Sequence, residues 1–159
     1  MVLAIPVSAV AQHQGHSLYA GMEGREIKSL SAEDIKDLRA GRGWSLALAA
    51  ELNGVPGPAH LLELKDGIGL SPDQVLTIEA IFAAMQAEAQ AAGERLIAAE
   101  AAIEAAFRAD DPTPDALRAL TDATAEAWAD LRFIYVSRHL ETPLLLTVEQ
   151  IARYNELRG

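Results

Sequence analysis

Residues 70–107 read LSPDQVLTIEAIFAAMQAEAQAAGERLIAAEAAIEAAF, and this stretch decides the fold. Apolar or small residues recur at alternating intervals of three and four positions, at Val75, Ile78, Phe82, Met85, Ala89, Ala92, Leu96, Ala99, Ile103 and Phe107. This spacing places them on one face and predicts a single long helix that packs along its whole length. The run 110–114 is Asp-Asp-Pro-Thr-Pro, which predicts that the helix ends near Ala109.

A second long helix is predicted directly after this break. Thr113 can cap it, with Pro114 at its first position, and Pro143 stops it. Its apolar face is predicted at Leu117, Leu120, Thr124, Ala127, Leu131 and Ile134, with Arg138 next in the series. Two long helices joined by so short a loop should lie antiparallel.

Shorter helices are predicted on both sides of the hairpin, over 31–39, 44–52, 59–65 and 147–157. Gly41, Gly43, the Asn53-Gly54 pair and Gly67 separate the first three from one another and from the hairpin. No segment alternates with a period of two for long enough to indicate a strand. The sequence therefore predicts an all-α fold, a long antiparallel helical hairpin with shorter flanking helices.

One short phrase occurs twice, as Leu70-Ser71-Pro72-Asp73-Gln74 and as Leu146-Thr147-Val148-Glu149-Gln150. The hydroxyl of Ser71 or Thr147 can accept a hydrogen bond from the first helical turn, and the glutamine three residues later can reach back to the N–H of the cap. Each phrase therefore predicts a helix start. We interpret both as elements that shape the fold and not as an active site.

The two phrases together with the hairpin resemble the LTXXQ-motif family, which includes the periplasmic stress proteins Spy and CpxP and relatives that bind or sense metals. The resemblance covers residues 70–159 well and residues 31–69 more loosely. It implies a bent helical hairpin, usually paired into a cradle-shaped homodimer. It also implies ATP-independent chaperone activity, envelope-stress signalling or metal-responsive behaviour, depending on the branch of the family.

Composition argues against several classes of function. The chain has 159 residues, a net charge of −10 and no cysteine. A nucleic-acid-binding protein would carry a basic patch, and no Lys/Arg-rich run is present. No stretch contains the roughly 18 consecutive uncharged apolar residues that a transmembrane helix needs. Neither a nucleophile elbow nor a phosphate-binding glycine loop occurs, so we predict that the protein is not an enzyme.

The acidic charge departs from the resemblance, because Spy-like cradles are expected to be basic and to attract acidic clients. The clients of this chain, if it has them, are predicted to be basic or mainly apolar.

The N-terminus predicts export. Residues 1–11 carry no charge and end in Ala9-Val10-Ala11 before the polar Gln12, which resembles a signal-peptidase site after an apolar segment. A basic stretch is missing, since the first Lys or Arg is Arg25. We interpret 1–11 as a signal-peptide remnant cleaved after Ala11, with an apolar tail as the alternative. Residues 12–30 are predicted to form a flexible His-containing arm and 31–159 a single helical domain, located in a bacterial periplasm.

The four histidines are the candidates for metal chemistry. His13 and His16 lie in the predicted arm near Met22 and Glu23, and His60 precedes Glu63 by three positions. Imidazole with carboxylate, and with thioether, suits zinc, copper or nickel. The ordinary interpretation is a pair of surface histidines in the arm and a half-buried His60, and a helix C-terminus by itself explains His139. The candidate ligands are His13, His16, Glu23, His60, Glu63 and His139, with no cofactor required.

Two functions stay open at the level of sequence. The first is a periplasmic chaperone or stress adaptor that binds unfolded or partner protein on a helical surface, in which an exposed subset of the aromatic residues forms an apolar patch. The second is a periplasmic protein that binds or senses a heavy metal through His, Glu and Met. The family resemblance favours the first.

Overall fold

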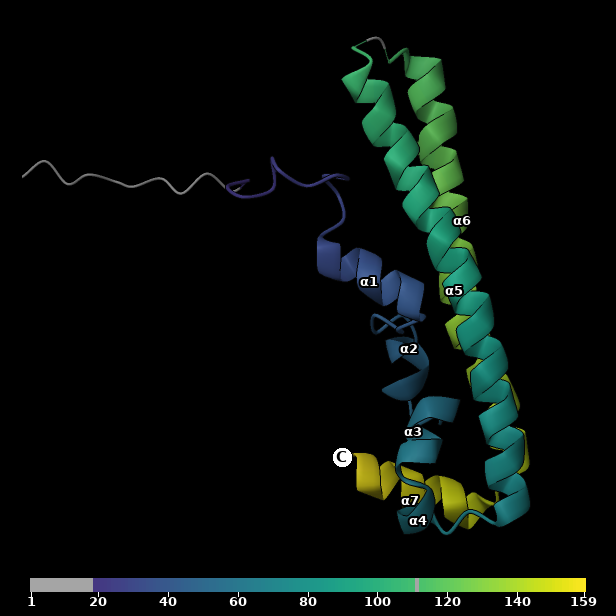
Figure 1. The fold of residues 1–159 in the computed structure, drawn as a ribbon. Helices are drawn as coiled ribbons and strands as arrows, with labels where there is room; N and C mark the ends of the chain where they lie inside the picture. Colours follow the sequence, from purple (N-terminus) through teal and green to yellow (C-terminus); the bar gives the residue numbers. More distant parts are fainter. Residues whose placement is uncertain (1–18, 111) are drawn as a thin grey trace, which may run out of the picture.

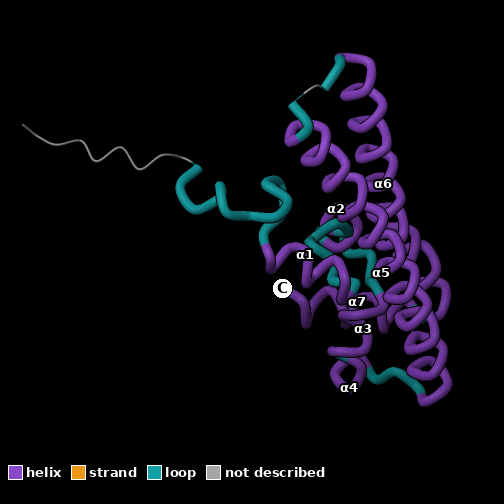
Figure 2. The backbone as a smooth tube through the Cα atoms, turned by 45° about the horizontal axis from the view of Figure 1, so that its top comes forward, coloured by secondary structure: helices purple, strands orange, loops and turns teal. Residues whose placement is uncertain are grey.

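The computed structural model describes residues 19–110 and 112–159, and every regular element in them is a helix (Figures 1 and 2). Helices α5 (Pro72–Arg108) and α6 (Pro114–Glu141) form a long antiparallel hairpin. Four short helices lie along one side of it: α1 (Ala32–Ala40), α2 (Leu48–Glu51), α3 (Pro58–Glu63) and α4 (Lys65–Ile68). A 3-10 turn, η1 (Thr142–Leu145), leads into α7 (Val148–Arg158). The predicted all-α hairpin is confirmed.

Local signals set the ends of the hairpin. The Ser71 hydroxyl accepts a hydrogen bond from the backbone of Gln74, and the Thr113 hydroxyl accepts one from the backbone of Ala116. The predicted end of the first long helix is also confirmed, since α5 stops at Arg108 and Asp110 has a left-handed φ of 61°. The sequence therefore determines where each long helix begins and where the chain reverses.

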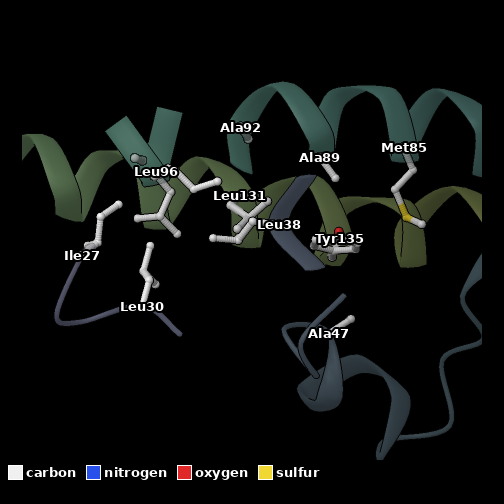
Figure 3. Packing of buried hydrophobic residues seen from close by; sticks show 12 residues of the cluster. Ile27, Leu30, Leu38, Ala47, Met85, Ala89, Ala92, Leu96, Leu131 and Tyr135 are labelled. Carbon is white, nitrogen blue, oxygen red and sulfur yellow. The ribbon is translucent and has the colours of Figure 1, made fainter. Parts of the chain in front are cut away.

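The main core lies between α5, α6 and α1, and Figure 3 shows it from close by. Small residues on α5 let α1 approach its backbone directly: a Cβ on Gly93 would lie 2.6 Å from the carbonyl oxygen of Leu38. The buried members are Ile27, Leu30, Leu38, Ala47, Met85, Ala89, Ala92, Leu96, Ile97, Ala127, Leu131 and Tyr135. Ile27 and Leu30 belong to the predicted arm 12–30, and their burial was not foreseen.

The buried face of α6 turns away from the predicted one after Leu131. The next fully buried positions are Tyr135 and His139, whereas Ile134 and Arg138 are half-buried. The cause is a second packing partner: α6 contacts α2 and the loops around it as well as α5. The prediction from apolar spacing assumes that a helix packs against one partner, so it identified only the face of α6 that contacts α5.

Two of the predicted short helices are wrong in extent. Helix 44–52 is reduced to α2, because Trp44 and Ser45 have left-handed φ values of 42° and 56° that no helix can include. The predicted helix 59–65 is divided at Leu64 into α3 and α4, and α4 ends at Ile68, where Gly69 caps it with a φ of 74°.

The predicted signal remnant 1–11 lies outside the described residues. Within the described part of the chain, no helix is long and apolar enough to span a membrane.

Candidate functional site

The two repeated phrases meet in space, which the sequence did not predict. The Gln74 side chain donates to Oε1 of Gln150 at 2.9 Å, and the Gln150 side chain donates to Oε1 of Gln74 at 3.0 Å. Each Oε1 also accepts the backbone N–H of its own cap, Ser71 at 2.8 Å and Thr147 at 3.0 Å. We call this arrangement of Ser71, Gln74, Thr147 and Gln150 the glutamine clasp.

The remaining amide hydrogens of the clasp are satisfied as well. Gln74 Nε2 donates to the carbonyl of Leu145 at 2.7 Å, and Gln150 Nε2 donates to the carbonyl of Gly69 at 3.1 Å. Leu70 and Leu146 pack beside it against a second core of Leu61, Ile68, Ile78 and Tyr154. The clasp thus joins the start of α5 to the start of α7, and its polar groups are engaged in holding the fold.

A cavity of about 490 Å³ lies between the hairpin and the short helices. Residues far apart in the sequence meet here, because the loop before α2, α2, α3, α5, α6 and α7 each contribute to its walls. Its apolar lining includes Trp44, Pro58, Phe82 and Met85, and its polar lining includes Glu51, His60, Tyr135, His139 and Arg158. A cavity with an apolar wall and a few grouped polar atoms is the usual form of a small-molecule site.

Glu51 occupies the centre of the polar wall. Its Oε1 lies 3.2 Å from Nδ1 of His60 and 3.7 Å from Nε2 of His139. Its Oε2 accepts a hydrogen bond from Arg158 at 2.9 Å, and Arg158 also donates to the hydroxyl of Tyr154 at 3.0 Å. One carboxylate of α2 is therefore in contact with α3, α6 and α7.

The ring of His139 has a defined orientation. Its Nδ1 lies 2.9 Å from the carbonyl of Tyr135, and since a carbonyl can only accept, Nδ1 carries the hydrogen. In the neutral ring Nε2 is then a bare acceptor. Gly57 packs against this ring, because a Cβ there would lie 2.6 Å from Cε1. The residue is 4% exposed, so the ring is held in place by its surroundings.

Buried polar atoms without a hydrogen-bond partner gather at this site. They include the free Nε2 of His139, the hydroxyl of Tyr135, and Nδ1 of His60, which is close to Glu51 but not aligned for a hydrogen bond. Burial raises the pKa of Tyr135 to about 12, so this side chain is a protonated phenol at neutral pH. Burying such groups without partners costs free energy, and each of these atoms is covered by the surrounding protein.

The structure unites two of the six predicted metal ligands. His60 and His139 lie on the same oxygen of Glu51, a residue that was not among the predicted ligands. Glu63 is exposed on α3 and Glu23 accepts a hydrogen bond from the backbone of Gly21, and neither lines the cavity. His13 and His16 lie outside the described residues. In residues 19–110 and 112–159, no three His, Cys, Asp or Glu side chains are placed to hold a metal ion.

Glu51 and Arg158 were missed by the sequence reasoning. Glu51 did carry a signal, because it is the one charged residue in the otherwise apolar run 46–52, and a lone carboxylate in such a run needs a partner when it is buried. Arg158 carried none, since its distance from Glu51 depends on how α7 packs.

A second feature is a group of exposed apolar side chains where α5 begins and α6 ends. Leu76, Leu140, Leu144 and Val148 are between 65% and 84% exposed. We call this group the apolar end. Among the aromatic residues, Phe133 and Phe107 are exposed, whereas Trp44 in the loop before α2 and Trp128 on α6 pack against each other with ring centroids 5.6 Å apart.

The comparisons with known proteins found no match: no family model, no curated protein and no solved structure matches this chain.

Proposed function

We propose that this chain is a helical protein that binds unfolded or partner proteins through its apolar end. The observation that carries the proposal is the four large apolar side chains at one end of the hairpin, each more exposed than buried. Grouped apolar side chains on a folded protein are typical of surfaces that contact other proteins.

The surroundings of the apolar end suit a binding surface. The glutamine clasp fixes the starts of α5 and α7 beside it, so the surface is presented by ordered helices. The net charge of −10 favours basic or mainly apolar clients over acidic ones. With the sequence resemblance, these points support an ATP-independent chaperone or stress adaptor that acts in the periplasm as a homodimer.

Light scattering from an aggregating, chemically denatured client tests the proposal. The protein would start at Gln12 and would first be treated with a chelator. We expect suppression near stoichiometric ratios without ATP or added metal, and loss of suppression in Leu140→Ser with Leu144→Ser. Phe107→Ser is the matched control, because Phe107 is 58% exposed at the far end of the hairpin. Equal activity of the two variants would contradict the proposal, as would a lack of suppression by the parent protein.

Metal binding stays the alternative prediction, and the structure gives it one supporting observation, the position of His60 and His139 on one carboxylate. The same assay separates the two functions. Suppression that returns only when zinc, copper or nickel is restored, and that is lost in His60→Ala or in His13→Ala with His16→Ala, would favour a metal-gated protein.

A further inference from the structure

We propose that the cavity between the hairpin and the short helices binds an organic anion, a carboxylate attached to an apolar body that carries an aromatic ring. The carboxylate would accept hydrogen bonds from Arg42 and from the loop 43–45 that follows it, and the ring would lie along Trp44 and Phe82. This inference does not depend on the proposed binding of proteins at the apolar end.

Arg42 is the accessible charged group of the cavity lining. Its side chain is 57% exposed, whereas that of Glu51 is 16% exposed. Only Nη1 of Arg42 is engaged, in a hydrogen bond to Asp37, so Nε and Nη2 have no partner among the described residues. These free N–H groups suit a carboxylate, because charge-assisted hydrogen bonds between a guanidinium and a carboxylate are strong ones.

The loop after Arg42 adds further donors. The N–H of Leu46 donates to the carbonyl of Gly43 at 2.7 Å, which closes a tight turn with the left-handed residues Trp44 and Ser45 at its centre. In the part of the chain that the structure describes, the N–H groups of Gly43, Trp44 and Ser45 donate to no acceptor. Successive N–H groups in a turn form a concave site for an anion.

The charges of the lining also favour an anion. Arg42 and Arg158 face a single carboxylate, Glu51, and Arg158 donates to Glu51 at 2.9 Å and so neutralises it. Asp37, the partner of Arg42, lies outside the lining. The chain as a whole has a net charge of −10, but salt screens remote carboxylates beyond about 8 Å at physiological ionic strength. The groups in the cavity therefore determine which charge binds there.

The other walls fit an aromatic ring. Trp44 and Phe82 are half-buried, so part of each ring remains accessible, and both line the cavity. The cavity volume of about 490 Å³ lies within the range of small-molecule sites, about 300–1,000 Å³. A ligand with a carboxylate and a ring would use both the donors and the apolar wall.

Isothermal titration calorimetry with sodium phenylacetate as the probe tests this inference on the chelator-treated chain. Phenylacetamide has the same body without the charge, and acetate has the charge without the ring. We expect phenylacetate to bind one site per chain, about tenfold or more tighter than either comparison ligand, since each lacks one of the two sets of contacts. Binding should also change the tryptophan fluorescence, because Trp44 lines the cavity.

Three variants connect the binding to the cavity. Arg42→Gln should weaken phenylacetate about tenfold or more. Asp37→Asn removes the carboxylate that competes for Arg42, so it should bind phenylacetate more tightly than the parent chain does. Arg39→Gln is the matched control, because Arg39 is an exposed arginine of α1 that pairs with Glu94 outside the cavity lining, and its binding should be unchanged.

Three outcomes would overturn the inference. The first is absence of phenylacetate binding by the folded parent chain. The second is equal binding of phenylacetamide, which would show that the charge of the ligand plays no part. The third is an equal loss of affinity in Arg42→Gln and Arg39→Gln, which would show that only the net charge of the protein matters.

Discussion

Tyr135 and Tyr154 are both buried, and they differ in what their hydroxyl groups meet. The hydroxyl of Tyr154 accepts a hydrogen bond from Arg158, whereas that of Tyr135 has no partner. Burial raises the pKa of both phenols, to about 12 for Tyr135. The same side chain therefore contributes to stability at one site and keeps unused hydrogen-bonding capacity at the other.

Replacing each tyrosine by phenylalanine should have opposite effects on the free energy of unfolding. Tyr135→Phe removes an unpaired buried hydroxyl and should leave that free energy unchanged or raise it by about 1 kcal/mol. Tyr154→Phe removes the partner of Arg158 and should lower it by about 1–2 kcal/mol. Urea unfolding followed by circular dichroism measures both. A loss of stability in Tyr135→Phe would mean that its hydroxyl has a partner, such as a bound water.

At the scale of a single element, α1 shows how a short helix is fixed at its start. Ser31 and Asp34 form a reciprocal capping box, in which Ser31 N–H donates to Asp34 at 2.7 Å and Asp34 N–H donates to Ser31 at 3.0 Å. Hydrogen bonds from the side chain and the backbone of Ser31 hold the pKa of Asp34 below its usual range. The ionised carboxylate therefore stabilises the folded helix.

This shift predicts an acid-sensitive contribution to the stability of α1. Because the pKa is lower in the folded state, the contribution is fully present above the unfolded pKa, about pH 4, and is lost as the pH falls through the folded pKa. Asp34→Asn should therefore show a smaller loss of stability on acidification than the parent. Thermal unfolding from about pH 5 downward measures it, with Glu33→Gln in the same helical turn as the control. Parallel pH profiles for Asp34→Asn and the parent would contradict the prediction.

At the scale of the whole molecule, the glutamine clasp connects the middle of the chain to its last helix. Gln74 and Gln150 are 76 positions apart in sequence and satisfy each other's amides. Either glutamine alone could cap its own helix, so the energy of the pair has to be measured as a coupling.

A double-mutant cycle should show that coupling. Gln74→Ala or Gln150→Ala alone should each lower the free energy of unfolding by about 1–3 kcal/mol, because the partner amide loses its contacts. The double variant should lose less than the sum by about 0.5–3 kcal/mol. Additive losses would mean that the two glutamines act only as separate caps.

The hairpin could be predicted from sequence because its information is local. The unbroken spacing from Val75 to Leu96 and the break at 110–114 act within a few turns of helix. The loop at Trp44 and Ser45 could not be predicted in this way, since its left-handed backbone accompanies a long-range contact, the packing of Trp44 against Trp128 of α6. The turn of the buried face toward Tyr135 has the same cause.

The candidate site was predicted only in part. His60 and His139 were identified as chemically interesting residues, and sequence gave no means of placing them on one carboxylate. The contacts of Glu51 come from α3, α6 and α7, so they exist only after these helices have packed. The sequence identifies the titratable and ligand-binding side chains, and the tertiary structure determines which of them come into contact.

The glutamine clasp also constrains the lengths of α5 and α6 relative to each other. The two glutamines meet only because α6 runs back along α5, and η1 then places the start of α7 beside the start of α5. One residue inserted into α6 would advance η1 and α7 by about 1.5 Å and rotate them by about 100°. A longer hairpin that keeps the glutamine clasp therefore requires matched insertions in α5 and α6.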